Sequence, residues 1–126
     1  MRYLGIDFGT KRVGIATSDD SGTMAFPLEV LDNTEDLLEK IAKIAENKKI
    51  EEIVVGESKD FSGKDNEVMG EIKFFVERLK EKLHLPIRFH PEFLTSAEAE
   101  RLQGKNDMLD ASAAALILKS YLERKK

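Results

Sequence analysis

Three acidic residues that lie far apart in the sequence could together bind catalytic metal ions. Asp7 ends an apolar segment near the start of the chain, Glu92 follows another such segment, and Asp110 lies early in a helical segment. Carboxylates without histidine or thiolate partners bind hard cations such as Mg²⁺ or Mn²⁺, which also accept phosphate oxygens as ligands. Two such ions activate water and stabilise the leaving oxygen in phosphodiester hydrolysis. The pattern therefore predicts Asp7, Glu92 and Asp110 as catalytic, metal-ligating residues.

Each acid also has a purely structural explanation. Asp7 could accept backbone N–H bonds in the turn that follows it, and Glu92 could be an exposed loop residue. Asp110 could stabilise a helix N-terminus, and Asp107, which shares its helix face, could cap that helix or join the metal site. A shared site is favoured because small side chains would let this helix lie close on a sheet and bring Asp110 towards Asp7: Ala111, Ala113, Ala114 and Ala115.

The predicted elements place these acids at one edge of a sheet. Apolar and alternating runs predict five strands, at residues 2–7, 12–18, 26–31, 53–56 and 86–90. Helical spacing and capping residues predict four helices, the first capped by Asn33 or Thr34, at residues 33–47, 67–83, 95–101 and 107–124. The carboxyl ends of parallel strands share one edge, which is where open α/β sheets bind ligands.

The order of these elements predicts an α/β fold. The first three strands should form an antiparallel meander, with Pro27 marking the third as an edge strand. The last two strands follow crossover helices and should lie parallel to the first strand. We therefore expect an RNase H-like architecture, with a mixed five-stranded sheet and helices on both faces, in a single domain over residues 1–126.

Composition narrows the kind of protein. No stretch approaches the roughly 20 apolar residues that a membrane span needs, and the first residues do not resemble a secretion signal, so we expect a cytoplasmic protein without membrane contact. The chain has no cysteine and two histidines, which excludes disulfides and a thiolate zinc site. Any metal must therefore be held by oxygen ligands.

The net charge of −4 argues against strong non-specific binding to nucleic acid, which depends on basic side chains neutralising phosphates. Net charge averages over the whole surface, however, and several basic residues fall in predicted loops or helix ends beside the candidate acids. The sequence therefore leaves room for a local rim that contacts nucleic acid, consisting of Thr10, Lys11, Arg12, Lys59, Lys64, Arg101 and Lys105.

Several segments together resemble the YqgF/RuvX family, the Holliday junction resolvases also described as pre-16S rRNA nucleases. The likeness begins with MRYLGIDFGTKRVGIATS and continues at residues 53–56, 91–99 and 110–118. It implies an RNase H-like fold and a metal-dependent nuclease acting on structured nucleic acid, either an rRNA precursor or branched DNA. By motif position, the family's three acids fall on Asp7, Glu92 and Asp110.

The chain departs from the family pattern at two places. Pro91-Glu92-Phe93 stands where the family has Asp-Glu-Arg, so an arginine suited to bidentate phosphate contact is missing and substrate binding should be weakened or rearranged. Gly56-Glu57-Ser58 stands where the family usually has Gly-Leu-Pro. Glu57 thus adds an acid that could join the site or could be a solvated loop residue.

Two other functions compete with a nuclease. A non-catalytic module that binds nucleic acid or protein could keep this fold while its site decays. A phosphate-loop ATPase lobe is the rival enzyme, because Gly5-Ile6-Asp7-Phe8-Gly9-Thr10 also resembles the first phosphate loop of sugar kinases and actin; the chain has no second such loop. The sequence does not fix the oligomeric state, and we expect a monomer or a homodimer. A homodimer would suit symmetric cutting of a junction, which requires two copies.

Overall fold

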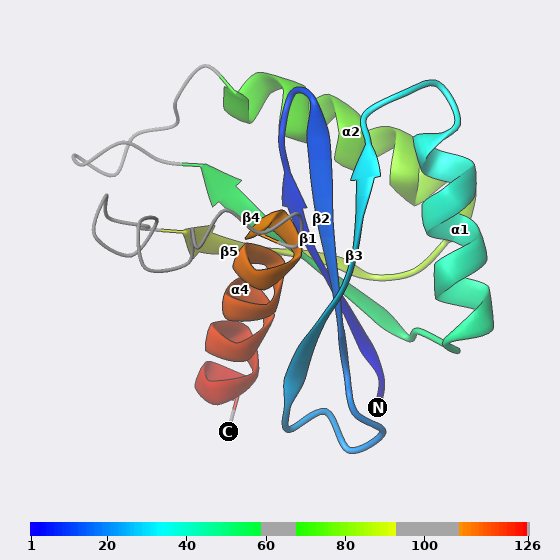
Figure 1. The fold of residues 1–126 in the computed structure, drawn as a ribbon. Coiled ribbons are helices and arrows are strands. Elements are labelled where there is room, and N and C mark those ends of the chain that lie inside the picture. Colours follow the sequence, from blue (N-terminus) through cyan, green and yellow to red (C-terminus); the bar gives the residue numbers. More distant parts are fainter. Residues whose placement is uncertain (59–67, 93–108, 126) are drawn as a thin grey trace.

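A computed structural model of the chain describes residues 1–58, 68–92 and 109–125 (Figure 1). The strands are β1 (Tyr3–Phe8), β2 (Arg12–Ser18), β3 (Ala25–Asp32), β4 (Glu52–Ser58) and β5 (Ile87–Glu92). The helices are α1 (Leu37–Asn47), α2 (Val68–Leu83) and α4 (Leu109–Lys125). None of the helices described here has both the length and the apolar character needed to cross a membrane.

The five strands form one mixed sheet in the order β3-β2-β1-β4-β5. β2 pairs antiparallel with both β1 and β3, whereas β4 pairs parallel with both β1 and β5. The predicted meander, the parallel fourth and fifth strands and the edge position of Pro27 in β3 are therefore confirmed. Helices α1 and α2 cover one face of the sheet and α4 crosses the other (Figure 1).

Two strands extend further than their sequence pattern indicates. β4 continues to Ser58 and β5 to Glu92, and these two residues are partners in the ladder. Glu57 and Glu92, which the sequence placed at or just past the carboxyl ends of their strands, are therefore strand residues at the end of the sheet. Pro91 interrupts the apolar pattern, but an edge strand tolerates a proline because its missing N–H faces no second neighbour.

The start of α1 also differs from the prediction. The helix begins at Leu37 with Asp36 at the N-cap position, rather than at Asn33 or Thr34. The Asn33 side-chain amide instead donates to the carbonyl of Gly9 at 2.9 Å, which ties the chain before α1 to the β1–β2 turn. The Thr34 hydroxyl bonds to the Asp36 carboxylate. Both side chains form hydrogen bonds within the loop instead of capping the helix, which begins at Leu37. The predicted helix at 95–101 lies outside the described residues.

The two faces of the sheet carry different cores. Under α1 and α2, large aliphatic side chains from every layer pack together, among them Leu4, Ile6, Ile15, Ile41, Ile53, Ile72 and Leu79. Under α4 the buried cluster is smaller and rich in alanine, comprising Tyr3, Ala16, Val54, Ala114, Ala115, Ile117, Leu118 and Leu122. A Cβ atom added at Gly5 would lie 2.9 Å from the Cβ atom of Leu118, so a glycine there allows α4 to approach β1 closely.

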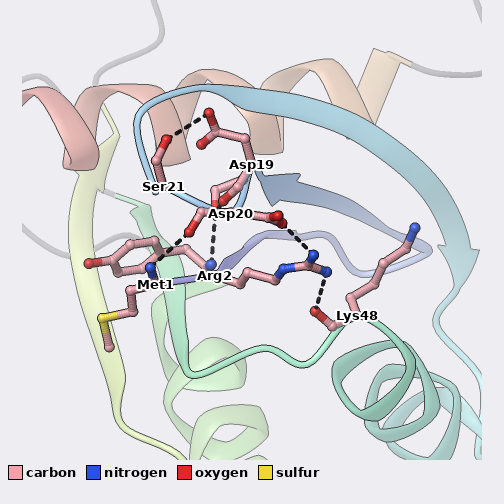
Figure 2. Close-up of polar contacts among 8 residues, drawn as sticks. Met1, Arg2, Asp19, Asp20, Ser21 and Lys48 are labelled. Atoms are coloured by element: carbon pink, nitrogen blue, oxygen red, sulfur yellow. Dashed lines mark hydrogen bonds and ion pairs between the residues drawn. The ribbon is translucent and has the colours of Figure 1, made fainter.

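The amino ends of β1 and β4 are held by contacts around the N-terminus (Figure 2). The Met1 ammonium donates to the Asp20 carbonyl at 2.8 Å, and the Arg2 guanidinium donates to the Lys48 carbonyl at 3.1 Å and pairs with the Asp20 carboxylate. The neighbouring Asp19 carboxylate accepts bonds from its own turn, and these bonds hold its pKa well below the usual range. Asp19 therefore stabilises the turn between β2 and β3, and Asp20 pairs this turn with Arg2.

Candidate functional site

Asp7 lies near the carboxyl end of β1 and is partly buried. Alternation along the strand places it on the same face as Tyr3 and Gly5, the face covered by α4. Its ladder partner in β2 is Gly14. The predicted orientation of Asp7, at the strand end and opposite the aliphatic core of Leu4 and Ile6, is confirmed.

The register of the parallel strands places Glu92 on the same face and at the same edge. Ile6 pairs with Val55, and Val55 pairs with Phe89. Continuing this register by one residue places Gly56 of β4 beside Asp7 of β1, and His90 of β5 beside Gly56. Glu92 comes two residues after His90 in β5. Two strand spacings separate β1 from β5, about 10 Å. Gly56, between them, has no side chain to fill this gap.

The direction of α4 brings Asp110 to this edge. Near the end of the helix, the ring of Tyr121 lies edge-on to that of Tyr3, with 6.2 Å between centroids. Further towards the helix N-terminus, Ala114 and Leu118 border Gly5. The helix therefore runs antiparallel to β1, and its first turn, which contains Asp110, lies at the level of Asp7. The buried Ala111 and Ala114 confirm the predicted close packing of this helix.

The other candidate acids are placed differently. Alternation in β4 puts Glu57 on the side of Ile53 and Val55, facing α1 and α2, although its charge is close enough to oppose part of the lowering of the His90 pKa. Asp107 lies outside the described residues. Where the structure describes side chains, no three acidic or histidine residues gather to hold a metal ion. Glu92 and Asp110 are described by their backbone alone.

The β1–β2 turn carries the described part of the predicted basic rim. Thr10, Lys11 and Arg12 are exposed and directly follow the end of β1. The turn is tight, because a Cβ atom at Gly9 would lie 2.5 Å from the carbonyl oxygen of Arg12. The turn is thus closely packed, and it lies directly beside Asp7. The other predicted rim residues lie outside the described residues: Lys59, Lys64, Arg101 and Lys105.

A buried histidine next to this edge was missed by sequence reasoning. His90 is 5% exposed, and its Nε2 atom lies 2.8 Å from the Ser120 hydroxyl of α4. Burial lowers the pKa of His90, the charge of Arg124 lowers it further, and Glu57 partly opposes both. The ring is therefore held neutral and joins β5 to α4. Its position two residues before Glu92, on the same strand face, was the available signal.

A second polar contact ties α4 to the sheet at the opposite end. The Tyr121 hydroxyl donates to the Glu52 carboxylate at 2.8 Å, and Glu52 is buried. The Arg88 guanidinium lies 3.8 Å from the same carboxylate. Tyr121 thus ties the helix to β4 and Ser120 ties it to β5. These two contacts fix how α4 lies on the sheet, and with it the position of the first helical turn.

Comparison with known proteins connects this architecture with nucleases. The family model described as RuvX, Holliday junction resolvase, matches residues 1–124. A protein of Nitratidesulfovibrio vulgaris is 39% identical over 132 residues, covering 97% of this chain and 93% of its own length. One of Sulfurihydrogenibium sp. is 39% identical over 133 residues, with 98% and 90% covered. Both are named "Putative pre-16S rRNA nuclease".

Solved structures confirm the fold. RuvC of T. thermophilus, in complex with a Holliday junction substrate, superposes with a TM-score of 0.63 at 15% identity, and 99% of this chain and 96% of that one are covered. The fowlpox virus Holliday junction resolvase gives a TM-score of 0.60 at 13% identity, with both chains covered completely, 100% each. The predicted RNase H-like architecture, with its mixed five-stranded sheet, is therefore confirmed.

Proposed function

Because this chain belongs to the RuvX family of Holliday junction resolvases, we propose that it hydrolyses phosphodiester bonds of structured nucleic acid with the help of Mg²⁺ or Mn²⁺. The nucleic acid would be an rRNA precursor or branched DNA. The relatives' names support the first substrate, and the junction-bound structural neighbour supports the second.

The proposed site consists of Asp7, Glu92 and Asp110. The observation that carries it is the close contact of α4 with β1 at Gly5, which brings the first turn of the helix to the level of Asp7. The donor set fits a hard cation because it contains only carboxylates, and Gly14 and Gly56 leave the neighbouring strands without side chains there. When bound, such ions supply a Lewis acid for activating water and stabilising the leaving oxygen.

Two further acids, Asp107 and Glu57, are less strongly supported as metal ligands. Asp107, three residues before Asp110, is a candidate additional ligand from the same segment. Glu57 is a weaker candidate, since strand alternation turns it towards α1 and α2. Its charge would more simply add to the negative potential at the edge.

Substrate would be oriented by the residues around this edge. We assign phosphate contacts to Thr10, Lys11 and Arg12 because they are exposed on a tight turn that follows Asp7. The rim would be completed by Lys59, Lys64, Arg101 and Lys105. Phe93 replaces the arginine expected from the family motif, so phosphate binding would depend more on this rim. We propose one cytoplasmic domain over residues 1–126, acting as a monomer or homodimer.

Cleavage assays with variants at the two ends of the sheet test this function. The substrates are a four-way DNA junction, duplex DNA, single-stranded RNA and a precursor rRNA fragment, each with Mg²⁺ or Mn²⁺. Asp7→Asn should abolish cleavage, whereas Asp20→Asn, at the opposite edge, should retain it. Equal cleavage by wild type and Asp7→Asn would exclude the proposed site.

The missing arginine favours one alternative, a non-catalytic binding module on the same fold. Folded wild-type protein that binds a substrate but cleaves none would establish that alternative.

A further inference from the structure

A pocket lies on the face of the sheet opposite the candidate acids. It has a volume of about 680 Å³ and opens between the β1–β2 turn, the start of α1 and the first half of α2. Its lining includes Phe8 and Thr10, the residues that flank Gly9 after Asp7. The pocket is within the size range of small-molecule sites. It therefore opens at the same end of β1 as the candidate metal site, on the other side of the sheet.

One wall of this pocket is an exposed aromatic platform. The Phe74 side chain is 66% exposed, whereas the neighbouring Phe75 on the same helix is buried. The Arg78 guanidinium carbon lies 5.8 Å from the centroid of this ring. Two further rings in the lining, Phe8 and Phe75, pack together with 4.9 Å between their centroids. An exposed ring with an arginine over it offers a flat surface on which another planar ring can stack.

The charges around the pocket select among planar ligands. Glu35 and Glu71 also line it, and their two carboxylates outnumber the one guanidinium in the lining, that of Arg78, so a phosphate placed inside would meet net negative charge. Carboxylates accept hydrogen bonds from the exocyclic amino groups of bases, as glutamate does with cytosine. The pocket thus complements an uncharged ring with an amino group. The wall is open at Gly70, where an added Cβ atom would meet nothing within 4 Å.

From these observations, we propose that this pocket binds an unpaired nucleobase bearing an amino group, stacked on Phe74 and hydrogen-bonded to Glu35 or Glu71. The inference rests on the proposed function only in taking nucleic acid as the substrate. Phosphates would follow the exposed Lys11 and Arg12 turn between the pocket and the acids. A chain with a net charge of −4 gains little from phosphate neutralisation alone, so stacking would supply affinity that charge does not.

The test is equilibrium binding of labelled single-stranded oligonucleotides in EDTA, measured by fluorescence anisotropy. Wild type should bind oligo-dC and oligo-dA more tightly than oligo-dT, which has no exocyclic amino group. Phe74→Ala should weaken binding of oligo-dC about tenfold, as expected for the loss of one stacked base. The matched control is Phe26→Ala, which removes another exposed phenylalanine, 46% exposed, on the edge strand β3 and should leave binding unchanged.

A second variant separates stacking from base recognition. The double substitution Glu35→Ala with Glu71→Ala should remove the preference for oligo-dC over oligo-dT while leaving some binding to both. Unchanged affinity in Phe74→Ala, an equal loss in Phe26→Ala, or no binding of any oligonucleotide by wild type would each overturn the proposal. Dissociation of a dimer by Phe74→Ala with unchanged binding would overturn it in favour of a second copy at this surface.

The failure of this proposal can be told apart from failure of the nuclease. Binding is measured without metal, so its outcome does not depend on metal binding by the proposed acids. Cleavage by wild type together with unchanged binding in Phe74→Ala would remove the pocket and keep the nuclease. The reverse pattern, with binding lost in Phe74→Ala but no cleavage of any substrate, would keep the pocket and remove the nuclease.

Discussion

The face of the sheet under α1 and α2 is packed with many large aliphatic side chains, whereas the face under α4 has a smaller buried cluster in which alanines of the helix approach a glycine of β1. Each fully buried aliphatic side chain contributes about 1.5–3 kcal/mol, and an alanine contributes much less. The α4 face instead contains buried polar residues, His90 and Glu52, with hydrogen bonds of defined geometry to the helix. The first face therefore mainly stabilises the fold, and the second mainly positions the helix that carries Asp110.

The largest expected effect on stability is on the aliphatic face. Leu79 in α2 is completely buried, so Leu79→Ala should lower the free energy of unfolding by about 2–5 kcal/mol. Urea denaturation measures this loss. Mn²⁺ affinity of the folded fraction should stay unchanged because the cavity lies on the far side of the sheet. A parallel loss of Mn²⁺ affinity would contradict the division between the two faces.

Metal binding to the proposed acids, on the face covered by α4, should stabilise the protein. A metal that binds only the folded protein should stabilise wild type by about 2.7 kcal/mol at a concentration 100-fold above Kd. Binding also relieves the repulsion among the proposed acids. Asp7→Asn should melt at a higher temperature than wild type without metal and should respond less to Mg²⁺ or Mn²⁺. Thermal melts with and without metal show both changes, and a full metal response in Asp7→Asn would disprove a site shared with Asp7.

A single added methyl group should distinguish the tight face from an open one. Gly5→Ala places a Cβ atom 2.9 Å from that of Leu118, so it should destabilise by about 1–3 kcal/mol and weaken metal binding by displacing α4. Gly70→Ala adds the same group in open space on α2 and should stabilise by about 0.5–1 kcal/mol. Equal effects of the two substitutions on Mn²⁺ titrations would show that the α4 contact does not position the site.

The His90–Ser120 hydrogen bond should contribute a smaller amount. Ser120→Ala leaves a buried ring nitrogen without its partner and should cost about 1 kcal/mol. Tyr121→Phe removes the comparable bond to Glu52 at the other end of the sheet. Because His90 adjoins the candidate acids, the serine variant should lower Mn²⁺ affinity more than the tyrosine variant at similar loss of stability. The opposite order would assign the positioning to Tyr121.

The smallest expected effect is a dependence of stability on pH. Burial lowers the pKa of His90, so below about pH 6.5 the unfolded chain binds a proton that the folded chain does not. Stability should therefore be complete above this pH and decline as the pH falls below it. Urea denaturation of His90→Asn should show a flatter pH profile than His84→Asn, which replaces an exposed histidine. Identical profiles would argue against a neutral buried ring.

Much of this architecture could be read from local sequence patterns. The period-two and apolar runs predicted the meander, the parallel strands and the edge position of Pro27, because each depends on neighbours along the chain. The alanines at 111 and 113–115 predicted a helix lying close on the sheet. The position of Asp7 at the end of β1 followed from the same alternation, so the carboxyl edge of the sheet was identifiable from the sequence.

Other features depend on partners that are distant in the sequence. β4 and β5 extend to Ser58 and Glu92 because these residues pair with each other, which their local composition does not indicate. Asn33 bonds to Gly9, 24 residues away, and this contact delays α1. His90 and Ser120 are 30 residues apart. The aromatic pocket likewise joins the β1–β2 turn to α1 and α2. Such contacts form only when the packed sheet brings the segments together, so the tertiary structure alone decided them.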